Sequence, residues 1–392
     1  GSTAIAGHDF SAGTTRALKV AIVAQVGLGL GALAVRATEG TVRTEKVSAV
    51  LDHRRLDRLA AWCLLAGLTG IALIVTLGNG DLSQFSALTS DQGYGGFSSS
   101  ASGISSGYFV TLENAAGLTL VIVALRFRLT SQGWAMPPIA LAGLAGALLL
   151  ATGQRQRFVV PLIAAALIWW KTSRKRSLVG VRTKAVTGVL LILLLSAVVN
   201  VARGGGERNY DVESLRRAQF GKGSDLFSPL AGLVATVPSR TPYLSGESYA
   251  EVVSLPVPRA IWRNKPEGSI VEITSLFAPG GSGIAFPEFG EFYANFGFLG
   301  VGLGCLAFAA LLEWLWQRLS STRRVGTSIW LAVSIAALLQ VFTRGGAAGQ
   351  FASLMGLLAA AFIASRVVDR WGVGQTDSVI GLESRRLASS VN

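Results

Sequence analysis

Long apolar stretches, separated by short polar segments, run along most of this chain. A helix that crosses the hydrocarbon core of a bilayer needs about 20 predominantly apolar residues, and a window of that length finds about nine such stretches. They cover residues 17–35, 58–78, 108–128, 134–153, 156–171, 184–202, 290–316, 326–343 and 346–368. None alternates between apolar and polar residues as a transmembrane β-strand does. The pattern therefore predicts an all-α polytopic membrane protein, with a single transmembrane domain over residues 1–392.

The composition supports a membrane protein and excludes other classes. Charged residues make up 15% of the chain, whereas soluble domains carry about 25%. The high apolar content excludes a disordered chain, and the two cysteines exclude a disulfide scaffold. Cys63 and Cys305 both fall in predicted helices, so we expect neither a disulfide nor a metal pair between them. No Walker-type glycine loop is present, so the chain is not expected to be an ATPase.

Lys and Arg residues, 35 in number against 22 Asp and Glu, indicate how the helices are oriented. The basic segments 36–58 and 171–184 should both be cytoplasmic, because cytoplasmic loops of membrane proteins are enriched in Lys and Arg. Alternation of the predicted helices then places the basic segments 126–128 and 318–324 on the same side. The predicted topology has an external N-terminus, a cytoplasmic C-terminus and one large external loop over residues 203–289. Within that loop, residues 212–235 are expected to include an amphipathic helix.

Several cations are predicted on the external side, against the general tendency. They are Arg155 and Arg157 after Gly153, then Arg259, Arg263 and Lys265 in a proline-rich segment, and Arg344 before Gly345 and Gly346. Arginine makes bidentate contacts with phosphate, and neighbouring glycines allow a ligand to approach the backbone closely. The combination indicates a site for a phosphate or a lipid pyrophosphate at the outer membrane surface. Taken singly, each cation is explained equally well by a lipid-headgroup contact or a salt bridge.

Carboxylates on the predicted external side are candidates for a general base. Glu288 and Glu291 flank Gly290 at the start of a predicted helix, where acidic residues also interact favourably with the helix dipole. Glu291 and Asn295 are four residues apart and should share one helix face. Glu291 is our candidate base, because burial near the membrane would favour its role as a proton acceptor. Glu113, inside the third predicted span, has either a functional role or a helix–helix hydrogen bond.

These motifs resemble those of one protein family. Residues 258–266, Pro-Arg-Ala-Ile-Trp-Arg-Asn-Lys-Pro, resemble the "PR-x-hydrophobic-W-x-x-KP" element of the bacterial O-antigen polymerases, the Wzy-like polymerases of oligosaccharide repeat units. Residues 246–249, Gly-Glu-Ser-Tyr, fit the stretch that precedes it, and 290–297 resemble the family's "GE-x-Y-x-NFG" helix start. The turns at 153–155 and 344–345 resemble its "G-x-R" and "RG" elements. The matches follow the family's order over about half of the chain.

The resemblance implies a GT-C-like glycosyltransferase of O-antigen, or lipopolysaccharide, biosynthesis, with its active site on the outer face of the bacterial cytoplasmic membrane. Donor and acceptor would both be glycans on undecaprenyl pyrophosphate, and a chain-length regulator protein would be a partner. No metal, other cofactor or nucleic acid is implied. The residues implied are Glu291 as the base; Arg155, Arg259 and Arg344 on the pyrophosphate, supported by Arg157, Arg263 and Lys265; and Tyr249 and Asn295 on the substrate.

Two other functions remain as alternatives. An O-antigen ligase is similar in topology, but it characteristically carries a histidine in its large external loop, and the last histidine of this chain is His53. A flippase or transporter of lipid-linked oligosaccharides should concentrate polar groups inside its spans, along a path through the membrane. Here the polar features gather in the predicted outer loops, which favours the polymerase.

Overall fold

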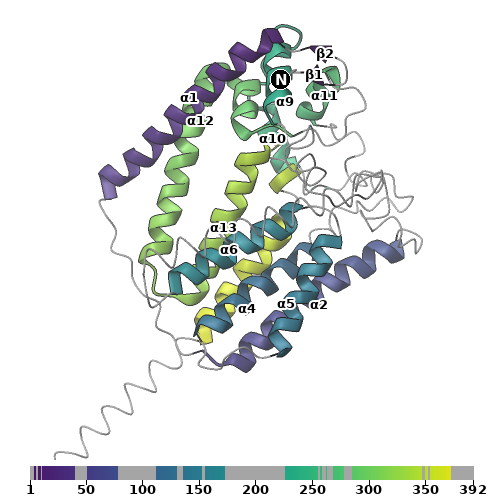
Figure 1. Ribbon diagram of the computed structural model, residues 1–392, viewed down its shortest axis with the longest axis vertical. Coiled ribbons are helices and arrows are strands. Elements are labelled where there is room, and N and C mark those ends of the chain that lie inside the picture. The colour runs from purple at the N-terminus through teal and green to yellow at the C-terminus, as the bar shows by residue number, and fades with distance from the viewer. Residues whose placement is uncertain are drawn as a thin grey trace, which may run out of the picture.

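A computed structural model describes a helical protein (Figure 1). The described residues are 4–5, 8–9, 11–39, 51–77, 112–129, 136–151, 155–172, 226–254, 257, 262, 268–277, 285–346, 349–351 and 354–371. The longer helices are α1 (Ser11–Glu39), α2 (His53–Leu77), α12 (Glu288–Ser321) and α13 (Val325–Arg344). The shorter ones are η3 (Asn114–Ala116), α4 (Gly117–Leu129), α5 (Met136–Ala151), α6 (Arg155–Thr172), α9 (Phe227–Thr236), α10 (Glu247–Ser254) and α11 (Ser269–Phe277). Residues 349–351 and 354–371 are also helical.

The helical class predicted from the apolar pattern is confirmed in the described residues. Helices occupy parts of all the predicted spans except 184–202, which lies outside the described residues. Four of them, α1, α2, α12 and α13, are long and apolar enough to cross a membrane. The described residues also include a two-residue antiparallel strand pair, in which β1 (Ala4–Ile5) meets β2 (His8–Asp9). Of the helix expected within 212–235, the structure describes α9, which begins at Phe227.

The basic segments of several helices meet at one end of the molecule, which we call the basic end. Its contacts are the paired hydrogen bonds from Arg36 to Glu313 (2.9 and 3.1 Å), the bond from Lys171 to the Ser320 carbonyl (2.5 Å), and the bond from Arg128 to the Thr172 carbonyl (3.3 Å). They join the C-terminal ends of α1, α4, α6 and α12. This agrees with the grouping of basic segments predicted from the positive-inside rule.

Helices α1 and α12 lie side by side and run in the same direction (Figure 1). A Cβ atom at Gly27 would meet the Gly302 carbonyl and Cys305, and one at Gly31 would meet the Leu306 carbonyl. Glycine at these positions therefore lets the two backbones approach closely, as small residues do between membrane helices. The parallel direction agrees with the predicted topology, in which both helices lead from the external side to the cytoplasmic side.

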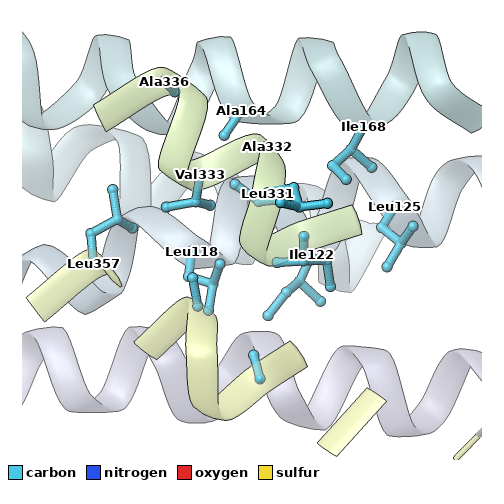
Figure 2. Close-up of a cluster of buried hydrophobic side chains, with 14 of the residues drawn as sticks. Leu118, Ile122, Leu125, Ala164, Ile168, Leu331, Ala332, Val333, Ala336 and Leu357 are labelled. Carbon is cyan, nitrogen blue, oxygen red and sulfur yellow. The ribbon is translucent and has the colours of Figure 1, made fainter. Parts of the chain in front are cut away.

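Three clusters of buried apolar side chains lie among the described residues, and the two larger ones hold most of the helices together. One joins α1, α9, α11 and α12, and the other joins α2, α4, α6, α13 and the last helix. In the second cluster, Leu118 and Ile122 of α4 face Ala164 of α6 and Ala332 of α13 (Figure 2). The small alanine side chains allow α6 and α13 to pack closely against each other.

The predicted span 290–316 lies within helix α12, which is sharply bent near its start. Phe296 and Gly297 have non-helical backbone angles, and Gly297 has a φ of 63°. A Cβ atom at Gly304 would lie 2.6 Å from the ring of Phe292, although residues twelve apart in a straight helix are separated by about 18 Å. The residues before the bend, 288–295, therefore fold back against those after it, 298–321. We call these segments the short arm and the long arm.

Candidate functional site

The short arm of α12 is buried by the helices of the preceding segment. A Cβ atom at Gly290 would lie 2.9 Å from the Phe286 ring and 3.0–3.2 Å from Leu230 and Leu233 of α9. Only glycine fits this contact without displacing its neighbours. The close packing carries the polar residues that flank Gly290 into the interior of the protein.

Glu288 and Glu291 are therefore both buried, with 3% and 0% of their surface exposed. They are three residues apart on the short arm and lie on the same helix face. Their carboxyl groups interact electrostatically with each other. Cys305 of the long arm is also within range of an electrostatic interaction with Glu288. The bend thus places two carboxyl groups together inside the protein, beside the long arm.

Tyr249 of α10 donates a hydrogen bond to Glu288. The distance from its hydroxyl to Glu288 Oε1 is 3.0 Å, and its ring packs against Phe292 with 6.0 Å between ring centroids. Burial, followed by the charges of Glu288 and Glu291, raises the pKa of the Tyr249 phenol. The phenol therefore keeps its proton and remains a donor to Glu288.

Asn295 closes the short arm at its C-terminal end. Its Nδ2 donates to Ser248 Oγ (2.8 Å) and to the Glu291 carbonyl (2.9 Å), and its Oδ1 accepts from the Gly246 amide (2.9 Å). The backbone amides of residues 244 and 245 donate to the last carbonyls of the arm, at 3.0 and 3.1 Å. Both donors and the acceptor of the Asn295 amide are thus bonded within the protein. The predicted common face of Glu291 and Asn295 is confirmed.

The turn after α13 lies against the residues that lead into the short arm. Gly345 has a φ of 57°, and a Cβ atom there would collide with the Phe286 carbonyl oxygen and approach the carbonyl group of Pro287. On the side where a Cβ atom would stand, the protein's own backbone therefore fills the space at Gly345. A Cβ atom at Gly346 would meet no atom within 4 Å. Arg344, just before the turn, ends α13 on the Glu288 side of the bundle.

Arg157 is paired with Glu113 in the interior. Its Nη1 lies 2.7 Å from Glu113 Oε2, and the two side chains are 3% and 0% exposed. Glu113 directly precedes η3 and α4, and Arg157 lies in the first turn of α6. Of the two roles left open for Glu113 by the sequence, the structure shows a polar contact between helices.

The other predicted site residues belong to parts of the chain that the structure does not describe. Arg259, Arg263 and Lys265 lie outside the described residues. Arg155 is the first residue of α6, but its side chain lies outside the described part. Among the described residues, no group of three or more His, Cys, Asp or Glu side chains is arranged to hold a metal ion.

Sequence reasoning did not select Glu288 as a functional residue. The signal was present, because Glu288 and Glu291 are three residues apart on a predicted helix. Acidic pairs are also common at helix starts simply because they interact favourably with the helix dipole. Only the burial of both carboxyl groups and the hydrogen bond from Tyr249 distinguish this pair from an ordinary helix start.

Comparison with known protein families identifies a relationship. The family model described as O-antigen polysaccharide polymerase Wzy matches residues 2–365, nearly the whole chain. Neither the search of curated proteins nor the search of solved structures gave a significant match.

Proposed function

The chain belongs to the O-antigen polysaccharide polymerase Wzy family, and from this premise we propose that it is a GT-C-type glycosyltransferase that joins lipid-linked oligosaccharide repeat units. The apolar helices α1, α2, α12 and α13 make it an integral membrane protein. The donor and the acceptor would each be a glycan on undecaprenyl pyrophosphate. The observation that carries the proposal is the buried carboxyl pair Glu288–Glu291, bonded by Tyr249 and set beside the turn that follows Arg344.

The reaction requires a base and a stabilised leaving group. A hydroxyl oxygen of the acceptor glycan attacks the anomeric carbon of the donor, and the bond from that carbon to the pyrophosphate oxygen breaks. The electron pair of the broken bond leaves with the lipid pyrophosphate, and the hydroxyl proton passes to Glu291. Glu291 suits this task because the short arm carries it into the interior, where water competes less for the proton.

The negative charge of the pyrophosphate would be met by arginines. Arg344 lies at the end of α13, on the Glu288 side of the bundle, and Arg155 and Arg259 would complete the contact, with Arg263 and Lys265 in support. Fixed arginine donors stabilise developing phosphate charge through bidentate bonds, so no metal ion is required. Arg157 would support the site through its bond to Glu113, which ties the first turn of α6 to α4.

The orientation in the membrane follows from the basic end. Its Lys and Arg residues would lie in the cytoplasm, together with the C-terminus. The short arm lies toward the opposite end of the bundle, because the long arm runs from the bend to Ser320 at the basic end. The carboxyl pair would therefore be reached from the outer face of the membrane, where lipid-linked repeat units would be joined.

An extension assay tests this function. Purified protein in lipid is incubated with undecaprenyl-pyrophosphate-linked repeat units alone, and the products are separated by length. We expect a ladder of longer glycans, formed equally well with a chelator present, and its loss in Arg259→Ala and in Arg344→Ala. Transbilayer movement of the lipid without extension would instead identify a flippase, and transfer only to an added non-repeat acceptor would identify a ligase-type enzyme.

A further inference from the structure

The two oxygen atoms of the Glu288 carboxyl group have different surroundings. Oε1 accepts the hydrogen bond from the Tyr249 hydroxyl at 3.0 Å. Oε2 is buried, yet no described N–H or O–H group donates to it. A buried oxygen atom without a hydrogen bond costs about 1–3 kcal/mol, so the arrangement indicates that something besides the described donors satisfies this atom.

A proton on Oε2 satisfies it directly. The carboxyl groups of Glu288 and Glu291 interact with each other inside the protein, and two ionised carboxylates in contact away from water repel strongly. If Glu288 carries a proton on Oε2, that O–H group becomes a donor to Glu291. The repulsion is then replaced by a charge-assisted hydrogen bond, which is among the stronger hydrogen bonds in proteins.

Resting on the function proposed above, we propose that Glu288 is the protonated positioning residue for Glu291, the ionised base. The Tyr249 hydroxyl holds Oε1, and the proton on Oε2 points at the Glu291 carboxylate and orients it. In the reaction, the hydroxyl proton of the acceptor moves to Glu291, while Glu288 keeps its own proton. The carboxyl pair thus begins with one proton and ends with two, and one proton is released to water afterwards.

The surroundings explain why the two neighbours take different roles. Glu288 is buried beside the long arm, near Cys305, and burial disfavours a charged group. The bond from the Tyr249 hydroxyl holds Oε1 in place and leaves Oε2 for the proton. Glu291 lies one turn further along the short arm, where Asn295 Nδ2 bonds to its carbonyl and fixes the backbone of that turn. The orientation of the base therefore depends on three elements, α10, the short arm and the long arm.

Glutamine replacements separate the two roles. A glutamine side chain has the shape of a protonated glutamate, with a carbonyl oxygen that accepts from Tyr249 and an N–H group that donates to Glu291. We therefore expect Glu288→Gln to keep its KM and to lose no more than about threefold in kcat in the extension assay. Glu288→Leu, which has no donor, should lose more than about tenfold in kcat. Glu291→Gln, which has no base, should lose about 10²- to 10⁴-fold.

Difference infrared spectroscopy provides a second measurement that does not depend on turnover. The carbonyl stretch of a protonated carboxylic acid should be present in the wild-type protein and absent in Glu288→Gln. Glu247→Gln is the matched control, because Glu247 is an exposed acid in the first turn of α10. It should leave both the infrared band and the extension rate unchanged.

The outcomes keep this inference separate from the proposed function. A wild-type protein that extends glycans, with Glu288→Gln as inactive as Glu291→Gln, would overturn the assignment and leave the polymerase standing. An unchanged infrared band in Glu288→Gln would overturn it as well. If the wild-type protein fails to extend glycans, the polymerase is refuted. If the infrared band is nevertheless present in the wild-type protein and absent in Glu288→Gln, the protonated Glu288 is supported.

Discussion

Glu113 and Glu288 are both buried in the helical bundle, with 0% and 3% of their surface exposed, but their partners are opposite in kind. Glu113 lies 2.7 Å from the guanidinium of Arg157. Glu288 lies against a second carboxyl group, Glu291, and accepts a bond from the neutral phenol of Tyr249. A cation fixes an acid in its ionised form, whereas a second acid makes the two compete for protons. The difference separates an acid that holds helices together from an acid that is suited to proton transfer.

The energetic consequences of the two arrangements also differ. Each member of a buried ion pair depends on the other, since removal of one leaves an uncompensated charge in the interior. A glutamine in place of Glu288 keeps an N–H donor for Glu291 and leaves no new unpaired charge in the interior. Substitutions at the two places should therefore affect different properties of the protein, namely stability at Glu113 and turnover at Glu291.

The largest effect on stability is expected for Glu113→Gln. It leaves the Arg157 guanidinium buried without its carboxylate, which should lower the free energy of unfolding by about 3–5 kcal/mol. Thermal unfolding of the purified protein measures the loss, with the exposed-site variant Glu247→Gln as the control. The exchanged pair Glu113→Arg with Arg157→Glu should recover part of the stability and of the extension activity. An exchanged protein that is stable but inactive would show instead that Arg157 contacts the substrate.

A smaller effect is expected at the bend of α12. Gly297→Ala would place a Cβ atom 3.1 Å from the Tyr243 hydroxyl, at a φ of 63° and a ψ of −152°. This backbone conformation is essentially restricted to glycine, so the substitution should cost about 1–3 kcal/mol. The strain falls on the short arm, so the extension rate should drop while the Glu113–Arg157 pair stays intact. Gly29→Ala in α1 is the matched control, because a Cβ atom there meets nothing within 4 Å. Equal rates in the two variants would contradict a role for the bend in placing the carboxyl pair.

The smallest effect is expected for Tyr249→Phe, which removes one hydroxyl group and keeps the ring that packs on Phe292. Loss of one hydrogen bond costs about 0.5–1.5 kcal/mol, so kcat should fall between about twofold and tenfold without a change in KM. Tyr243→Phe is the control, since the Tyr243 hydroxyl interacts with Tyr293 instead of a carboxylate. A change in KM alone for Tyr249→Phe would indicate that this residue contacts the substrate directly.

Much of the helical framework follows from local sequence. Apolar runs in α1, α2 and α13 are long enough to identify these helices without any tertiary information. The helix start at Glu288 and the common face of Glu291 and Asn295 follow from helical periodicity, which depends only on neighbours in the chain. The family was also identified from motifs in order along the chain, and the family model confirms it.

The details of the candidate site depend on contacts between distant residues. Glu113 and Arg157 are 44 residues apart, and Asn295 and Ser248 are 47 apart. No local pattern in the sequence indicates which acidic residue pairs with which basic residue. Nor does it indicate that the polar groups of the Asn295 amide form hydrogen bonds within the protein. The bend at Gly297 is not predicted by the sequence, for a related reason. Apolar residues continue on both sides of it, so hydrophobicity alone predicts one straight helix.

The sequence by itself determined that this is a helical membrane protein of the Wzy polymerase family, with its basic segments grouped on one side. Those properties depend on composition and on periodicity along the chain, which are local. Only the tertiary structure decided that Glu113 has a cation beside it and that Glu288 has another acid. The environment of a buried charge is made by helices brought together in folding, and it determines whether that charge stabilises the fold or takes part in proton transfer.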